Sequence, residues 1–175
     1  LSGLSLAVGV ALAEALEATG ARGIGLKWPN DVLAGGAKLA GILIETQGDM
    51  LSNATAVIGV GLNVRAAPSL PEAATVALAE LIDADIDRNR LLTRVLVSLD
   101  RVLEAFDRHG FAPLREAWQA RHVWQGKPVR VMGGAGPVEG VALGVDAAGV
   151  LRIETIDGVQ VIHAGEVSLR PGTFV

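Results

Sequence analysis

The sequence predicts an α+β protein: a mixed or antiparallel sheet with helices, followed by a small β-barrel of SH3-like size. Three observations lead to this class. Short β-rich runs joined by tight turns occupy residues 24–64. Apolar residues recur with a period of about 3.6 over residues 87–106, as in an amphipathic helix. From residue 126 onward, short β runs alternate with glycine turns. We therefore predict one unit over residues 1–125 and a second over residues 126–175.

The first unit opens with a helix that we expect to be buried. It runs over residues 5–19, where Ser5 can cap its start and Gly20 ends it. Pro29-Asn30-Asp31 and Gly35-Gly36 are turn sequences, so short antiparallel strands are expected on either side of them. These strands cover residues 24–28, 32–34, 38–46 and 54–64.

Helices follow these strands, and short strands follow the helices. The helix over residues 87–106 has the clearest apolar period, and two others are expected over residues 72–82 and 111–122. The composition changes near residues 124–127, from helical segments to short β runs with glycines, and we place the boundary between the two units there. Trp118 and Trp124 are interpreted as packing between the units. Beyond that point the expected strands are 128–132, 138–145, 150–155, 159–163 and 167–169.

Composition excludes several classes of function. The net charge of −4 argues against nucleic acid as a partner of this chain, because phosphate binding needs a basic face. The absence of cysteine excludes disulfides, zinc–thiolate sites and thiol nucleophiles, and it is compatible with a reducing, cytoplasmic location. No apolar run approaches the ~20 residues of a membrane span. The histidines have no metal-ligand spacing, so no protein-held metal site is expected.

The start of the chain suggests a longer parent. The sequence begins at Leu1, without an initiator methionine and inside a helical pattern. We expect it to be the C-terminal part of a longer polypeptide.

Polar groups with an unusual spacing surround the first turn. Lys27-Trp28-Pro29-Asn30-Asp31 is followed by Lys38, which opens an apolar strand directly after a glycine turn. Asn30-Asp31 is also good turn chemistry, and a lysine at a strand start is commonly only a solvated charge. Here, however, the strand behind Lys38 is apolar on both faces and contains Gly41. A cationic amine beside accessible backbone suits a carboxylate or phosphate ligand.

A second strand carries glycines at alternate positions. Gly59 and Gly61 lie on one face of it and leave a smooth trough, and Asn63 ends it within reach of a base or ribose. The alternative is a strand packed closely under a helix. Trp28 could line a pocket wall, and Lys27 could meet phosphate. No Walker-type loop or dinucleotide fingerprint is present.

Together these segments resemble the biotin–protein ligases, also called biotin–[acetyl-CoA-carboxylase] ligases. The resemblance rests on Lys27-Trp28-Pro29-Asn30-Asp31, on residues 38–45 (KLAGILIE) and on residues 58–64 (IGVGLNV). The tail, with Gly126-Lys127-Pro128-Val129 and residues 165–170 (GEVSLR), is similar to the SH3-like C-terminal domain of that family. The resemblance implies a catalytic domain related to class II synthetases.

The family uses ATP and biotin to form biotinyl-5′-adenylate, then transfers biotin to a lysine of a biotin carboxyl carrier protein. By resemblance, Lys38 contacts the biotin carboxylate and the α-phosphate, and Lys38 and Asp31 are the catalytic candidates. Asn30 and Asp31 would lie near the nucleotide and its Mg²⁺, which would be held mainly through phosphates. The remaining binding candidates implied are Lys27, Trp28, Gly41, Ile42, Leu43, Gly59, Gly61, Asn63 and Arg170.

Two family segments have no counterpart in this sequence: the glycine- and arginine-rich loop and the segment that binds the biotin ureido ring. We therefore expect these 175 residues alone not to support normal turnover. A lipoate or octanoate transferase relative is an alternative. So is a biotin-responsive repressor whose DNA-binding domain lies upstream, or an α/β interaction module without activity. A homodimer is compatible with the resemblance.

Overall fold

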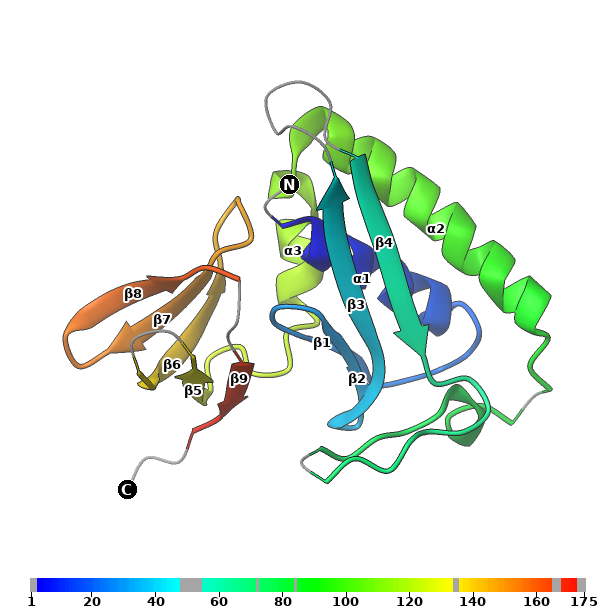
Figure 1. Ribbon diagram of the computed structural model, residues 1–175, viewed down its shortest axis with the longest axis horizontal. Coiled ribbons are helices and arrows are strands. Elements are labelled where there is room, and N and C mark those ends of the chain that lie inside the picture. Colours follow the sequence, from blue (N-terminus) through cyan, green and yellow to red (C-terminus); the bar gives the residue numbers. More distant parts are fainter. Residues whose placement is uncertain are drawn as a thin grey trace.

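The chain forms two separate antiparallel sheets. The computed structural model describes residues 3–47, 55–71, 73–83, 85–133, 136–164 and 168–172. The first sheet has the order β1-β2-β3-β4 and consists of β1 (Ile24–Lys27), β2 (Asp31–Ala34), β3 (Ala37–Gln47) and β4 (Thr55–Leu62). The second has the order β8-β7-β6-β5-β9 and consists of β5 (Pro128–Met132), β6 (Val138–Val145), β7 (Leu151–Thr155), β8 (Gly158–Ile162) and β9 (Ser168–Pro171) (Figure 1). The α+β class is confirmed.

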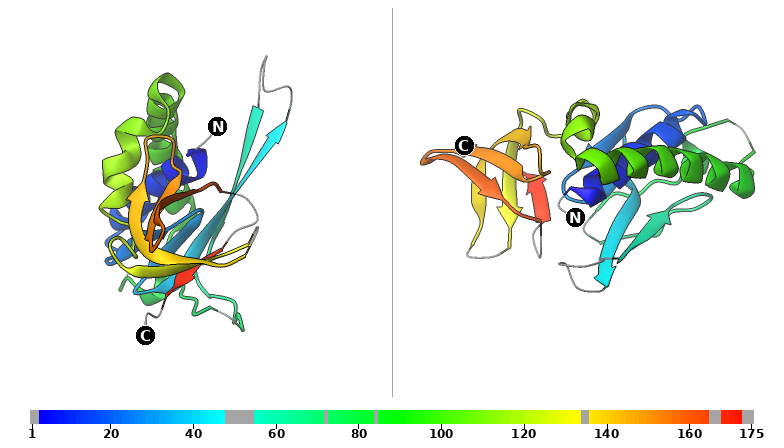
Figure 2. Two further views of the ribbon diagram at one scale, coloured as in Figure 1. Left: turned by 90° about the vertical axis from the view of Figure 1, so that its left-hand side faces the viewer. Right: turned by 90° about the horizontal axis from the view of Figure 1, so that it is seen from above.

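Two helices cover one face of the first sheet. Helix α1 (Leu4–Glu17) contacts β1, β2 and β3 as well as helix α2 (Arg88–His109), and Figure 2 shows both helices on the same side of the sheet. Apolar residues surround α1, and most of its length is buried as expected. In α2 the buried residues Leu91, Val95 and Val102 face inward. These helices leave the opposite face of the sheet uncovered.

The helix ends follow local chemistry, with one correction. Asp87 caps α2 by accepting hydrogen bonds from the backbone of Asn89 and Arg90. Ser5 does not cap α1, which begins after Gly3; its hydroxyl instead donates to the carbonyl of Pro29 at 3.1 Å. The predicted cap is thus a contact that joins α1 to the turn after β1.

The helix expected over residues 72–82 is wrong in the part that the structure describes. Residues 74–76 run extended beside β3: the Lys38 amide donates to the carbonyl of Ala74, and the Val76 amide donates to the carbonyl of Lys38. Only the 3₁₀ turn η1 (Leu78–Glu80) is helical there. Pairing with β3 satisfies the backbone groups that a helix would otherwise have used.

The helix expected over residues 111–122 is divided and shortened. A 3₁₀ turn η2 (Ala112–Leu114) leads into α3 (Arg115–Gln119). The chain then turns to pair with β1: Leu26 donates to the carbonyl of Arg121, and Val123 donates to the carbonyl of Leu26. Trp118 is buried in this region, which agrees with a packing role.

The second sheet is open where a barrel was expected. Strands β8 and β9 are its two edges, and among the described residues no pairing joins them. The first two predicted strands match β5 and β6, and the next two agree with β7 and β8 within one residue. Part of the prediction over 167–169 lies outside the described residues. In the described part of the chain, no helix is long and apolar enough to cross a membrane.

Candidate active site

A cluster of three charged side chains gathers at the first turn. The Asp31 carboxylate at the start of β2 binds Lys38 Nζ at 2.6 Å and Lys27 Nζ at 3.2 Å, each with a different oxygen. The side chains of Asp31 and Lys27 are mostly buried, whereas that of Lys38 is 36% exposed. The ring of Trp124 lies 5.6 Å from Lys27 Nζ and adds a cation–π contact. One carboxylate therefore holds two ammonium groups, and Lys38 is the accessible one.

A β-bulge gives Lys38 its direction. In the pairing of β2 with β3, Val32 lies opposite Ala40 but Leu33 lies opposite Lys38, so β3 has one extra residue between them. Asp31 is paired with Gly41. Because cross-strand partners share a face, the extra residue brings Lys38 to the face of Asp31 and Gly41. Strict alternation from Ile42 would have placed Lys38 on the helix side.

The candidate residues divide between the two faces of the sheet. Lys27 pairs with Asp31, Gly61 with Gly41, and Gly59 with Leu43. These residues and Lys38 thus share the open face, where Leu43 is 60% exposed. Ile42 is turned to the other face, where it is buried against α1. Ile42 therefore lies on the opposite face of the sheet from the three glycines and Leu43.

Gly41 provides the space in which Lys38 meets Asp31. A Cβ at Gly41 would lie 3.3 Å from both Cε and Nζ of Lys38. At Gly59 and Gly61 an added Cβ would make only ordinary van der Waals contacts, the nearest at 3.5 Å from the Leu43 carbonyl oxygen. The alternative of close packing under a helix is thus not observed for these two glycines.

We predict that Gly41→Ala spares folding and damages the site. The backbone of Gly41 has no positive φ, and the atoms that must move are the end of a flexible side chain. The melting temperature should change little, while displacement of Lys38 should slow the carboxylate activation that the family resemblance implies by about tenfold or more. Thermal unfolding and single-turnover kinetics check the two parts. Unaltered kinetics would contradict the role given to Gly41.

Three of the expected site residues brace the backbone. Asn30 Nδ2 donates to the carbonyl of Ile42 at 2.9 Å. Asn63 Nδ2 donates to the carbonyls of Lys38 and Val76, each at 3.2 Å. Trp28 is fully buried, and its indole N–H donates to Gly149 at 3.2 Å. These contacts support the strand and turn that carry the cluster, and Trp28 also lines a separate cavity of about 220 Å³, as expected for a pocket wall.

The charged cluster opens into a cavity of about 440 Å³. Its lining combines three strands of the first sheet and the segment after β4 with strand β9 of the second sheet: Lys27, Asp31, Lys38, Leu70, Pro71, Ala73 and Arg170. The lining has three cationic side chains and one carboxylate, a net charge of +2. Such a cavity attracts an anion with more than one negative charge.

Sequence reasoning missed the loop side of this cavity. Leu70, Pro71 and Ala73 line it because residues 74–76 are held beside Lys38. Pro68 and Pro71 were the available signal: prolines this close together favour an extended loop, although Pro71 also suits a first helical turn.

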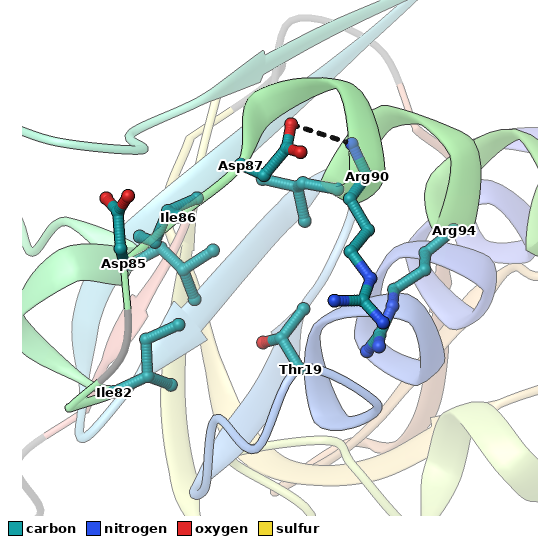
Figure 3. Close-up of a pocket in the computed structure, with 9 residues that line it drawn as sticks. Thr19, Ile82, Asp85, Ile86, Asp87, Arg90 and Arg94 are labelled. Atoms are coloured by element: carbon teal, nitrogen blue, oxygen red, sulfur yellow. Dashed lines mark hydrogen bonds between the residues drawn. The ribbon is translucent and has the colours of Figure 1, made fainter.

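A smaller cavity of about 150 Å³ lies between the start of α2 and the end of α1 (Figure 3). Arg90, Arg94, Asp85 and Asp87 are all among its lining residues, so its charge is balanced. The Arg94 guanidinium donates to the carbonyl of Ala18, which closes the end of α1. This cavity lacks the net positive charge of the first, so the Lys38 cavity is the stronger candidate for an anionic ligand.

No group of three or more metal-ligating side chains is found in the described parts of the chain. Within the Lys38 cavity Asp31 is the one carboxylate among the lining residues, and both of its oxygens contact lysines. A bare divalent cation therefore does not fit these residues, whereas a polyanion does.

Comparison with known proteins defines the class. A model of the biotin/lipoate A/B protein ligase family matches residues 1–63, the part that contains the charged cluster and most of the glycine-bearing face. A model of the biotin protein ligase C-terminal domain matches residues 126–170, which form the second sheet. The fold is thus that of the biotin and lipoate protein ligase class.

Individual relatives narrow this class. The biotin–[acetyl-CoA-carboxylase] ligase of Paracoccus denitrificans is 35% identical, over 94% of this chain and 71% of that protein. The biotin protein ligase of Aquifex aeolicus, solved in complex with biotin and ATP, is 30% identical with a TM-score of 0.85, over 98% of this chain and 72% of that one. The chain belongs to the biotin protein ligase family.

The chain spans only part of some relatives. The bifunctional ligase/repressor BirA of Escherichia coli (strain K12) is 34% identical over 96% of this chain but over 53% of its own length. The chain therefore covers about half of that protein.

Proposed function

We propose that this chain carries the carboxylate- and nucleotide-binding half of a biotin protein ligase site. The complete protein would join biotin to ATP as biotinyl-5′-adenylate and transfer biotin to a lysine of a biotin carboxyl carrier protein. The observation that supports this most directly is the cluster of Lys27, Asp31 and Lys38 at the mouth of a cavity with a net charge of +2. Arg170 completes its cationic lining.

Charge explains what the cluster would do. For adenylate formation a carboxylate oxygen must attack the α-phosphorus while pyrophosphate leaves, so two anions must approach. Lys38, the more exposed ammonium, would lie between them and stabilise the charge of the transition state. Lys27 and Arg170 would hold the remaining phosphate oxygens. Asp31 orients both lysines, so that little reorganisation is needed when substrate binds.

The open face of the sheet suits the tail of biotin. Gly41 and Gly61 are paired and leave backbone accessible beside Lys38, and Leu43 adds an exposed apolar side chain. An aliphatic tail laid over this strip would place its carboxylate at Lys38. Ile42 supports the strip from the opposite face, and Gly59 extends it.

Mg²⁺ would enter with the nucleotide. Because both oxygens of Asp31 contact lysines, the residues of this cavity do not by themselves form a Mg²⁺ site. The ion prefers to keep water and to bind through phosphates, so we assign it no step performed by these side chains.

The decisive experiment measures product. The protein that carries this chain is supplied with ATP, Mg²⁺, biotin and a carrier domain, and biotinyl-adenylate and biotinylated carrier are detected by mass spectrometry. Both products are expected, and their absence would overturn the proposal. The 175-residue chain tested alone checks the expectation that it lacks normal turnover. Lipoate and octanoate in place of biotin test the transferase alternative.

We also propose a boundary between the two units, a surface for self-association and the absence of nucleic-acid binding. We expect the boundary between the units near residues 124–127, in the segment between α3 and β5. β4 forms the outer edge of the first sheet and has no charged residue, so a second copy could pair there. With a net charge of −4, we expect no nucleic-acid binding by these residues.

A further inference from the structure

A turn of the second unit contacts the turn between β1 and β2, residues 28–30, which we call the catalytic turn. The indole N–H of Trp28 donates to the carbonyl of Gly149, which lies between β6 and β7, and the bond is buried. Trp28 is next to Lys27 and precedes Pro29, Asn30 and Asp31. The contact therefore joins the chain segment that carries two of the three cluster charges to a different sheet.

Asp146 fixes the shape of the second-unit turn. Its Oδ1 accepts hydrogen bonds from the backbone of Ala148 at 2.8 Å and Val150 at 2.9 Å. The Gly149 amide also donates to the Asp146 carbonyl at 3.1 Å. Gly149 is buried with φ +82, and a Cβ there would lie 2.8 Å from Cα of Gly3. The turn is thus held in one conformation and packed against the start of α1, with the Gly149 carbonyl directed at Trp28.

The other anchors of the catalytic turn come from the first unit. Ser5 donates to the carbonyl of Pro29, the Asn30 side chain donates to the carbonyl of Ile42, and the Ile42 amide donates to the carbonyl of Asn30. These three anchors belong to α1 and β3, and the fourth, from Trp28 to Gly149, crosses to the second sheet. Loss of the Gly149 contact leaves the buried indole N–H of Trp28 without a partner.

We propose that Asp146 is a positioning residue for the cluster of Lys27, Asp31 and Lys38, acting through Gly149 and Trp28. The inference concerns ligand geometry at the same site and rests on the proposed function only for its kinetic consequence. The second unit then serves the catalytic turn in two ways: Arg170 lines the cavity, and the Asp146–Gly149 turn fixes the segment that presents Asp31.

The test uses matched variants. Trp28→Phe removes the indole N–H but retains an aromatic ring, and Asp146→Ala removes the turn acceptor. Asp146→Asn retains an oxygen that can accept both backbone bonds and should behave as the wild type. Thr155→Ala is the control: Thr155 shapes the turn between β7 and β8 through the Gly158 carbonyl and the Asp157 amide, at the other end of the strand.

The first readout is chemical labelling of lysine, which does not depend on ligase activity. An amine held in an ion pair is less available to acetic anhydride. In Trp28→Phe and Asp146→Ala, acetylation of Lys38 relative to Lys127 should rise about two- to fivefold, the effect of weakening one ion pair. Asp146→Asn and Thr155→Ala should leave the ratio unchanged. Circular dichroism verifies that each variant is folded, and Asp146→Ala decides the question if Trp28→Phe is not.

The second readout separates positioning from stability. In the protein that carries this chain, Asp146→Ala should lower kcat for adenylate formation about tenfold with little change in KM for biotin. An unchanged Lys38 labelling ratio in folded Asp146→Ala would overturn the inference, and so would an equal rise in Thr155→Ala. A wild-type protein without ligase activity would instead overturn the proposed function and leave the labelling result standing.

Discussion

Lys38→Ala should reduce adenylate formation by about 10²–10³-fold, the loss typical when one preorganised charge-stabilising group is removed from a site. The side chain is 36% exposed and belongs to the cavity lining, and its ammonium binds Asp31 at 2.6 Å. Without it, the carboxylate and the phosphate would meet with their repulsion uncompensated. Single-turnover detection of biotinyl-adenylate measures the loss directly.

Folding should survive this substitution. The Lys38 ammonium is accessible to solvent, and the backbone contacts of residue 38 with Ala74 and Val76 do not depend on its side chain. The melting temperature should therefore shift by no more than about 3 °C. Lys127→Ala is the matched control: the Lys127 side chain is exposed, its ammonium donates to the carbonyl of Val123, and its removal should leave the kinetics unaltered. A collapse in melting temperature with normal turnover per folded molecule would refute the role of Lys38.

Much of the fold was predictable because its signals are local. The apolar period of α2, the glycine turn between β2 and β3, and the strands β5 and β6 each depend on neighbouring residues. The helix prediction over residues 74–76 was wrong for the opposite reason. Their extended conformation is imposed by β3, through bonds that join Ala74 and Val76 to Lys38, and no local pattern records such a partner.

The meeting of the three charged side chains was predictable, but their arrangement was not. Lys27, Asp31 and Lys38 do meet, as their spacing around one turn suggested. The bulge that brings Lys38 to the open face depends on strand register, which the sequence does not specify at the level of a single residue. Trp28 was expected at a pocket wall and does line a cavity, but the bond from its indole N–H to the Gly149 carbonyl, more than a hundred positions away, has no local signal in the sequence.

A buried histidine should make the protein acid-sensitive. His122 is 6% exposed and packs on Trp118 with ring centroids 4.7 Å apart. Burial, reinforced by the charge of Lys127, lowers the pKa of His122 to about 4; Gln125 favours the charged form and offsets part of this shift. The Gln125 side chain is close to the His122 ring but forms no hydrogen bond with it: within the described structure neither ring nitrogen has a hydrogen-bond partner. The imidazole is therefore neutral in the folded protein at neutral pH.

The sign of the pH effect follows from linkage. The pKa of His122 is about 4 when folded and 6.5 when unfolded. Above the unfolded value neither state binds the proton, so stability is complete. As the pH falls from 6.5 through 4, only the unfolded chain gains a proton, and the free energy of unfolding should fall by about 3 kcal/mol in total.

Denaturant unfolding at a series of pH values tests this expectation. The carboxylates are the same in the wild type and the variants, so a difference between their stability curves reports on the histidine alone. His122→Phe fills the same apolar space against Trp118 and cannot titrate, so its stability should fall less between pH 6.5 and 4. His109→Gln, which removes an exposed histidine, should retain the wild-type slope. Parallel curves for the wild type and His122→Phe would show that His122 does not control acid stability. Because residues 121–123 pair with Leu26, next to Lys27, protonation of His122 should loosen this edge of the site first.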